Sequence, residues 1–271
     1  MPVLFISRGS MSGACQVVEC LGKNTGIRCI SRESLVKRAM RHSETARRLL
    51  QELNGAISHY ERFSALRWRY LVLLRHALLE EIVEDNVVYH GYSAHFLLPV
   101  LQHFIRVRID APIEFRIRMT MERLKCDEEK AGSIIKTDDE QRVKWARFMY
   151  CRDIRDPRFY DLHLNLGHMS LKAVCGLLTQ SFSEQEFQAN PQTREEVKKL
   201  LLEATVQAAL VSDARLSECE ISAKLEDGCM NLYGPYLGAV RATAIDVAKK
   251  AACTADVFYK PGYSPWLDTF S

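Results

Sequence analysis

The first 21 residues constrain the fold more than any other stretch of the chain. A short apolar run, Val3–Ile6, leads into a loop rich in glycine and serine, Ser7–Gly13, and then directly into an apolar-periodic segment ending near Leu21. This order predicts a buried strand, a tight loop and a helix. The N–H groups of such a loop and of the helix N-terminus converge on one point, where their partial positive charge can hold a phosphate group.

The loop lacks the basic residue that such sites usually carry. In the phosphate loop of nucleoside triphosphatases, lysine and then serine or threonine follow the last glycine. After Gly13, those places hold Ala14 and Cys15. A Gly/Ser loop that only joins a strand to a helix therefore remains an alternative, as does a redox or covalent switch at the Cys15 thiol.

The chain then alternates short apolar runs with helical segments, which predicts a parallel sheet covered by helices. Ligands of such sheets bind at the carboxyl ends of the strands, so we expect Ser31, Arg32, the loop Gly91–Ser93 and Asp110 to surround one crevice with the first loop. The predicted strands after the first are Ile27–Ile30, Asn86–Tyr89, Phe104–Ile109 and Asp161–Leu166.

Helical periodicity is clear in three further regions. Residues 42–84 contain two apolar faces, one with Leu49, Leu50 and Leu53 and one from Leu66 to Ile82, separated by Asn54-Gly55. A helix is predicted over Ile113–Leu124, and a second begins at Asp127. This charged pair could close over phosphates as a lid or form a surface hairpin. Another helix is predicted over Ser170–Phe182, with Ser170 as its N-cap.

Composition excludes several classes of protein. The 271 residues include 37 Lys and Arg and 34 Asp and Glu, so the net charge of the chain does not indicate a protein that binds nucleic acid. No basic leader or membrane-spanning apolar run is found, which predicts a cytoplasmic protein. The 9 cysteines include no C-x-x-C pair, so we expect reduced thiols and no metal site formed by them.

Several motifs, in order, resemble the cytidylate-kinase-like branch of the P-loop nucleoside monophosphate kinases. That branch carries roughly SR-x-x-GSGG in the first loop, a DRE-type motif after the second strand, GRGAN after the third, and K-x-x-D-x-x-R in the lid. The corresponding segments here are SRGSMSGA, ISRESLVKRA, HGYSAHFLL, IDAPIEFRIRMTMER, IIKTDDEQRVKWARFMY and DPRFYDLHLN. The resemblance covers most of residues 1–185.

The resemblance implies an α/β P-loop fold with a helical lid, and transfer of the ATP γ-phosphoryl to CMP, dCMP or a similar small acceptor with Mg²⁺. It assigns nucleotide binding to Ser10, Met11, Ser12, Gly13, Ala14 and Cys15. It assigns the acceptor to Arg32, Tyr92, Asp139 and Arg142. It assigns transfer of the phosphoryl group to Arg116 and Arg118.

The departures from the family pattern keep a second function open. Met11 replaces the first loop glycine and Ala14 the last, Tyr92 and Ser93 replace the Arg-Gly of GRG, and Ser31 replaces the Asp of DRE. Each lost phosphate contact lowers transition-state stabilisation. The alternative is a catalytically inactive sensor that binds a nucleotide or another phosphorylated ligand.

Residues 183–194 are polar and predict a linker to a C-terminal domain, residues 194–262. The predicted elements are a helix over Thr193–Val211, strands over Glu220–Leu225 and Cys229–Tyr233 joined at Asp227-Gly228, a helix over Ala239–Ala252 and a strand over Thr254–Tyr259. This αββαβ order resembles a BON domain. The resemblance implies a small regulatory module that contacts a ligand or a protein partner.

Overall fold

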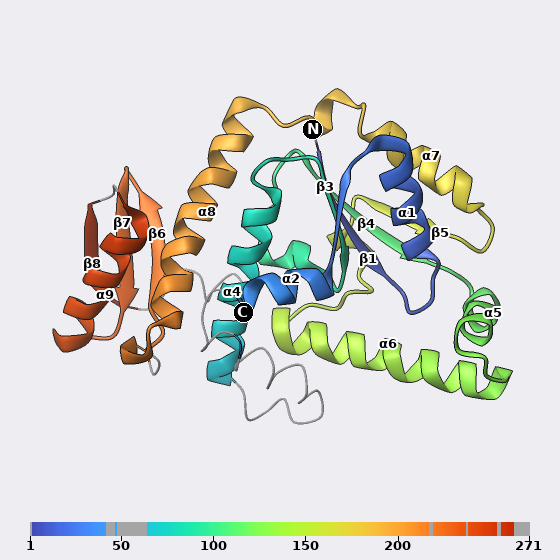
Figure 1. The fold of residues 1–271 in the computed structure, drawn as a ribbon, viewed down its shortest axis with the longest axis horizontal. Coiled ribbons are helices and arrows are strands. Elements are labelled where there is room, and N and C mark those ends of the chain that lie inside the picture. The colour runs from blue at the N-terminus through green and yellow to red at the C-terminus, as the bar shows by residue number, and fades with distance from the viewer. Residues whose placement is uncertain are drawn as a thin grey trace. The chain divides into compact units, whose positions relative to one another are not determined.

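The computed structural model describes residues 2–41, 47, 64–216, 219–236, 238–253 and 256–262. The chain forms two compact units, one of Met1–Arg32 with Glu84–Thr193 and one of Glu33–Val83 with Arg194–Ser271. The first unit contains the parallel sheet expected from the sequence (Figure 1). The second joins a buried helix to the C-terminal segment.

The sheet of the first unit has five strands, all parallel, in the order β2-β3-β1-β4-β5. The first strand of the chain is therefore central, and its carboxyl end lies between those of β3 and β4. The predicted fold class is confirmed. The bounds of the strands are β1 (Val3–Arg8), β2 (Arg28–Ser31), β3 (Val87–Gly91), β4 (Phe104–Asp110) and β5 (Leu162–Asn165).

Two helices, α1 (Ala14–Thr25) and α7 (Leu171–Ser181), cover one face of this sheet. Their apolar sides and the strands form one aliphatic core. Ser170 caps α7, since its Oγ accepts a hydrogen bond from the Ala173 N–H at 3.1 Å, as the sequence predicted. The core includes Leu4, Ile6, Val17, Leu21, Ile105, Val174 and Leu178.

A helical hairpin follows β4. Its first helix, α5 (Ile113–Leu124), has the predicted bounds, and its second, α6 (Glu128–Tyr150), begins where the acidic run predicted a start. Asp127 is the N-cap of α6, and its carboxylate accepts from the Lys130 N–H at 2.8 Å. The hairpin continues directly from the carboxyl end of a sheet strand, which is the position that a lid requires.

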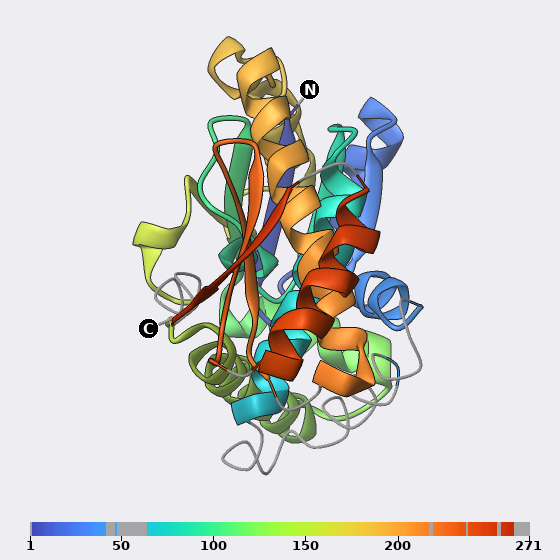
Figure 2. The ribbon, with the colours of Figure 1, turned by 90° about the vertical axis from the view of Figure 1, so that its left-hand side faces the viewer.

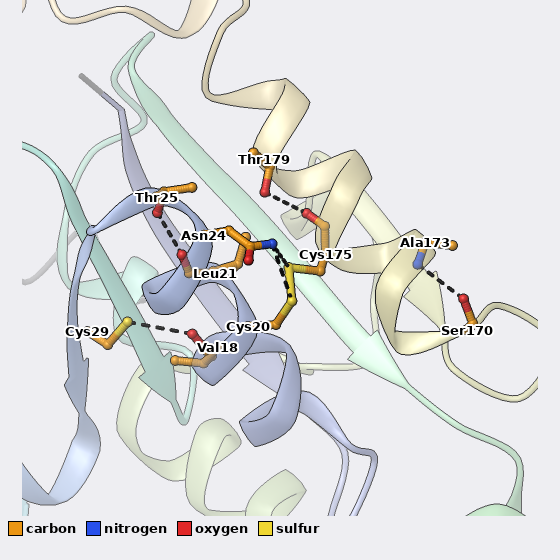
Figure 3. The surroundings of a disulfide bond; sticks show 10 residues. All are labelled: Val18, Cys20, Leu21, Asn24, Thr25, Cys29, Ser170, Ala173, Cys175 and Thr179. Carbon is orange, nitrogen blue, oxygen red and sulfur yellow. Dashed lines mark hydrogen bonds between the residues drawn. A yellow bond between two sulfur atoms is a disulfide. The ribbon is translucent and has the colours of Figure 1, made fainter.

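A disulfide between Cys20 and Cys175 joins α1 to α7, with their Cα atoms 6.3 Å apart. The expectation that all cysteines are reduced was therefore wrong for this pair. The two residues are separated by 155 positions, so no spacing rule could pair them; only the packing of α1 beside α7 brings them together. Asn24 Nδ2 lies 3.6 Å from Cys20 Sγ and 3.5 Å from Cys175 Sγ (Figure 3).

The C-terminal part of the second unit has the predicted helix-strand-strand-helix-strand order (Figure 2). Strands β6 and β7 form an antiparallel hairpin, and β8 pairs parallel to β7. The turn residues Asp227 and Gly228 both have positive φ, 51° and 78°, as the predicted two-residue hairpin requires. The elements are α8 (Pro191–Ser212), β6 (Ser222–Glu226), β7 (Cys229–Gly234), α9 (Gly238–Ala252) and β8 (Val257–Pro261).

Two further helices belong to this unit, α2 (Arg32–Ala39) from its second residue on and α4 (Ser64–Ile82). The predicted apolar face between Leu66 and Ile82 lies on α4, where the described side chains are nearly all buried. The predicted face of Leu49, Leu50 and Leu53, and the Asn54-Gly55 break, lie outside the described residues. No helix in the described ranges is long and apolar enough to cross a membrane.

Polar side chains link α4 to α8 inside the second unit. The His76 Nε2 and Thr205 Oγ1 atoms lie 3.1 Å apart, and Arg75 Nη2 lies 3.8 Å from a Glu203 carboxylate oxygen. Burial lowers the pKa of Arg75 to about 10, an effect that the charge of Glu203 opposes. Arg75 therefore stays protonated at neutral pH, and its charge lies close to the Glu203 carboxylate of α8.

We expect Cys175→Ser to lower the free energy of unfolding by about 2–4 kcal/mol, because the disulfide limits the freedom of the unfolded chain. Urea denaturation without reductant measures the difference. Dithiothreitol should destabilise the wild type by a similar amount and leave Cys175→Ser unchanged. Cys126→Ser, which removes a free thiol, is the control. Equal stability of the wild type and Cys175→Ser under oxidising conditions would contradict the assignment.

Candidate functional site

The loop between β1 and α1 adopts the tight conformation that its glycines predict. Met11 and Gly13 both have positive φ, 54° and 82°, and the Ser12 N–H donates to the Gly9 carbonyl at 3.4 Å. Gly13 is the N-cap of α1, makes no side-chain hydrogen bond there, and no acidic residue follows in the first turn. The N–H groups at the start of α1 are therefore not capped by a side chain, which leaves a site of positive potential.

A carboxylate from the lid occupies part of this loop. Asp139, on α6, accepts a hydrogen bond from the Ser10 N–H at 3.2 Å and pairs with Arg116 Nη2 at 2.7 Å. Arg116, on α5, also donates through Nε to the Ser10 carbonyl at 2.6 Å. The lid thus contacts the loop through one anion and one cation. Asp139 takes a loop amide that a phosphate oxygen could use.

A second contact connects the lid to the end of β1 and to the loop after β3. Arg142 donates through Nη1 to the Arg8 carbonyl at 2.9 Å, and its guanidinium carbon lies 4.7 Å from the centre of the Tyr92 ring. The guanidinium carbon of Arg32 lies 5.0 Å from the same ring and 5.6 Å from the ring of Trp145. Tyr92 therefore contacts two cations, each by a cation–π interaction.

Hydroxyl groups connect the strand ends beneath the loop. The Oγ atoms of Ser7 and Ser93 lie 3.2 Å apart, and the Tyr160 hydroxyl donates to Ser7 Oγ at 3.2 Å. Arg108 Nη1 lies 3.4 Å from the same Ser7 oxygen. This network joins β1, β4, the loop after β3 and the segment before β5, so the groups at the carboxyl end of the sheet are held in fixed positions.

Arg108 and Asp110, both on β4, form a two-pronged ion pair with N–O distances of 2.7 and 3.1 Å. Burial alone would raise the pKa of Asp110, but the hydrogen bonds and charge of Arg108 outweigh it and the pKa is lowered. Burial would lower the pKa of the Arg108 guanidinium, but the hydrogen bonds and negative charge of Asp110 outweigh this effect, and the pKa is raised. The pair therefore stays ionised at neutral pH and holds its geometry rather than exchanging protons.

A cavity of about 530 Å³ lies at this end of the first unit and is lined mainly by charged side chains. Three carboxylates line it, those of Asp110, Asp139 and Glu140. Seven cations line it: Arg8, Arg108, Arg116, Arg142, Lys144, Arg147 and Arg155. This excess of positive charge, with planar guanidinium groups predominating, is suited to binding a ligand that carries several phosphate oxygens.

The structure brings most of the predicted site residues together. Arg116, Asp139 and Arg142 line the cavity, whereas Arg118 is exposed on α5 and is not part of its lining. Arg32 and Tyr92 meet Arg142 through the ring contacts. None of the six predicted loop residues, Ser10 to Cys15, is part of the cavity lining. Two of them contact residues that are: Ser10 bonds to Asp139 and Arg116, and Cys15 Sγ lies 2.6 Å from Arg8 Nη1.

Sequence reasoning missed five of the seven cavity cations: Arg8, Arg108, Lys144, Arg147 and Arg155. Arg8 had a signal, because it immediately follows the buried run of β1 and so had to lie at a carboxyl strand end. Arg147 and Arg155 had none, since each has a local charged partner, Asp153, typical of a solvated surface.

Comparison with known proteins gives one family and a set of related folds. The model of the cytidylate kinase-like family matches residues 3–168. No curated protein matches the chain. An uncharacterised protein from Eubacterium ventriosum is 18% identical, with a TM-score of 0.53 over 68% of this chain and 100% of that one.

Two other solved structures resemble the chain less closely. TT1252 from Thermus thermophilus is 20% identical, with a TM-score of 0.45 over 68% of this chain and 97% of its own. Shikimate kinase from Acinetobacter baumannii, solved with shikimate, is 12% identical, with a TM-score of 0.40 over 69% and 96%. The family match spans more than half of the 271 residues and contains the loop, the sheet and the lid. The chain therefore belongs to the cytidylate kinase-like family.

Proposed function

We propose that the protein is an ATP-dependent phosphotransferase that transfers the γ-phosphoryl group to a nucleoside monophosphate, with CMP or dCMP as the first candidates. The observation that carries this proposal is the cavity at the carboxyl end of the sheet, where seven cations face three carboxylates. Phosphoryl transfer needs little covalent chemistry from the protein. It needs two phosphorylated molecules held in line and their negative charge neutralised.

The loop is the proposed site of the ATP phosphates. The hydroxyl of Ser12 is buried and has no hydrogen-bond partner in the described part of the chain, so a phosphate oxygen would satisfy it. The uncapped start of α1 adds N–H donors at the same loop. Within the described ranges no three side chains form a metal cluster. Mg²⁺ would therefore arrive with the nucleotide, held largely by phosphate oxygens and water.

The acceptor is proposed to bind between the ring cluster and the lid. Arg32 and Arg142 lie on Tyr92 and can turn towards a monophosphate, while the aromatic faces of Tyr92 and Trp145 offer stacking surfaces for a base. In the reaction an oxygen of the acceptor phosphate attacks the γ-phosphorus, and the bond from that phosphorus to the β-phosphate oxygen breaks. Arg116 would stabilise the charge on the transferring group.

Binding of ATP requires a change at Asp139. Its carboxylate holds the Ser10 N–H and neutralises Arg116, and a phosphate oxygen would compete for both partners. Displacing Asp139 would leave Arg116 free to pair with the nucleotide, while Asp139 would move towards the acceptor as the family resemblance implies.

The C-terminal BON-like segment is proposed to regulate the acceptor side. It shares a compact unit with α4 and most of α2, and α2 begins at Arg32. The buried contacts of Arg75 and His76 with α8 tie α4 to this segment. A ligand or protein bound to the segment would therefore act on α4 and α2, the helices that share its unit.

A coupled assay for ADP tests the proposed reaction, with ATP, Mg²⁺ and each nucleoside monophosphate in turn; shikimate serves as a non-nucleotide acceptor. We expect turnover with CMP or dCMP. Arg116→Gln should lower it about 100-fold, as expected for loss of a cation at the transferring group. Arg123→Gln, an exposed position on the same helix, should be within twofold of the wild type.

Absence of turnover with every acceptor would contradict the kinase. Calorimetry with ATP and CMP then separates the remaining candidates. Binding without turnover would support a nucleotide sensor, the function that Ala14 and Cys15 favour because neither supplies a loop cation. Absence of both binding and turnover would overturn the two functions together.

Asp139→Asn tests the competition between this carboxylate and phosphate. Loss of one negative charge beside the loop should raise the affinity for inorganic triphosphate about tenfold, an effect reduced by the partial exposure of Asp139. Glu129→Gln, an exposed position on the same helix with the same change in charge, should alter it less than twofold. Calorimetry measures both. Unchanged or weaker binding by Asp139→Asn would show that Asp139 does not block the loop.

A further inference from the structure

The guanidinium of Arg8 takes an unusual place beside the phosphate loop. Arg8 is the last residue of β1, and its Nη1 lies 2.6 Å from the Sγ of Cys15, in the first turn of α1. Counted from Gly9 rather than onwards from Gly13, the spacing of a phosphate loop places Ala14 at the last glycine and Cys15 at the lysine. A cation therefore reaches the lysine position from the opposite end of the loop.

Arg8 differs from the other arginines of the cavity in its charge balance. Within the described part of the chain, no carboxylate lies within ion-pair distance of Arg8, and its Nε is buried without a hydrogen-bond partner. Each of the other cavity arginines has a carboxylate partner: Arg108 has Asp110, Arg116 has Asp139, Arg142 has Asp138, and Arg147 and Arg155 share Asp153.

A half-buried guanidinium without a counter-charge is unfavourable unless an anion joins it, because burial removes water that would otherwise solvate it. The neighbouring groups favour the same occupant. The Ser12 hydroxyl is buried without a partner, and the start of α1 carries no acidic residue. Three groups at this loop would therefore be stabilised by an anion: the Arg8 guanidinium, the Ser12 hydroxyl and the N-terminus of α1.

We propose that Arg8 is the cation of the phosphate loop and contacts the terminal phosphates of the bound nucleoside triphosphate, in place of the missing lysine at position 15. This assignment rests on the proposed function and names the residue that replaces the lost charge. Arginine suits the role, since its fork can bind two phosphate oxygens at once, whereas a lysine acts as a point charge. The small Cys15 side chain leaves room for the guanidinium.

Equilibrium binding of a non-hydrolysable ATP analogue and of AMP, both with Mg²⁺, tests the role of Arg8. We expect Arg8→Gln to weaken binding of the triphosphate about 30-fold, as for loss of one charge-assisted contact, and to change binding of AMP less than threefold. Arg8→Lys, which keeps the charge, should stay within about fivefold of the wild type. Thermal unfolding of each variant verifies that it is folded.

Rescue supplies the sharper control. In the Arg8→Gln background, Cys15→Lys restores a cation at the loop and should recover at least half of the lost binding free energy for the triphosphate. Cys15→Gln, of similar size and uncharged, should recover none. If Arg8→Gln proves unstable, Arg8→Met takes its place in both the binding and the rescue experiments, because it leaves no additional polar group buried.

The outcomes separate this proposal from the proposed function. If the wild type binds the triphosphate and Arg8→Gln binds it equally well, Arg8 is not the loop cation and the phosphotransferase proposal stands. Equal weakening of AMP and triphosphate would also overturn the assignment, since a terminal-phosphate contact must discriminate between them. If the wild type binds neither nucleotide, both proposals are wrong.

Discussion

The first unit depends on how positive charge is held at the carboxyl ends of its parallel strands. Arginines from β1, β4 and the lid converge there, and most are paired with carboxylates from the same elements. These pairs hold the guanidinium groups in defined positions at the cavity.

Two of these ion pairs differ in the elements that they connect. Arg108 and Asp110 lie on one strand, stay ionised and connect to the hydroxyls of Ser7 and Tyr160, so they act as framework. Arg116 and Asp139 lie on different helices of the lid and both contact Ser10, so a movement of the lid changes the loop directly. The first pair joins groups on the sheet, whereas the second joins the lid to the loop.

Much of the fold could be predicted because its signals are local. The bounds of α5, the Ser170 cap and the Asp227-Gly228 turn follow from periodicity, a hydroxyl at a helix start and two residues that tolerate positive φ. Non-local features escaped. The disulfide depends on the packing of two helices. The arginines of the second predicted helix, Arg75 among them, indicated a solvated face, but Arg75 is buried and its partner Glu203 comes from the C-terminal segment.

The residues of the candidate site could also be predicted only in part. Arg116, Asp139 and Arg142 could be predicted because family motifs carry them, whereas Arg8 precedes the loop and lies outside the position where the phosphate-loop pattern carries its cation. A crystal structure with an ATP analogue, CMP and Mg²⁺ tests most directly how this cavity works. The triphosphate should lie on the loop between Gly9 and Cys15, with the Asp139 carboxylate withdrawn from the Ser10 N–H. A structure in which Asp139 still holds that N–H and no phosphate contacts the loop, at saturating nucleotide, would contradict it.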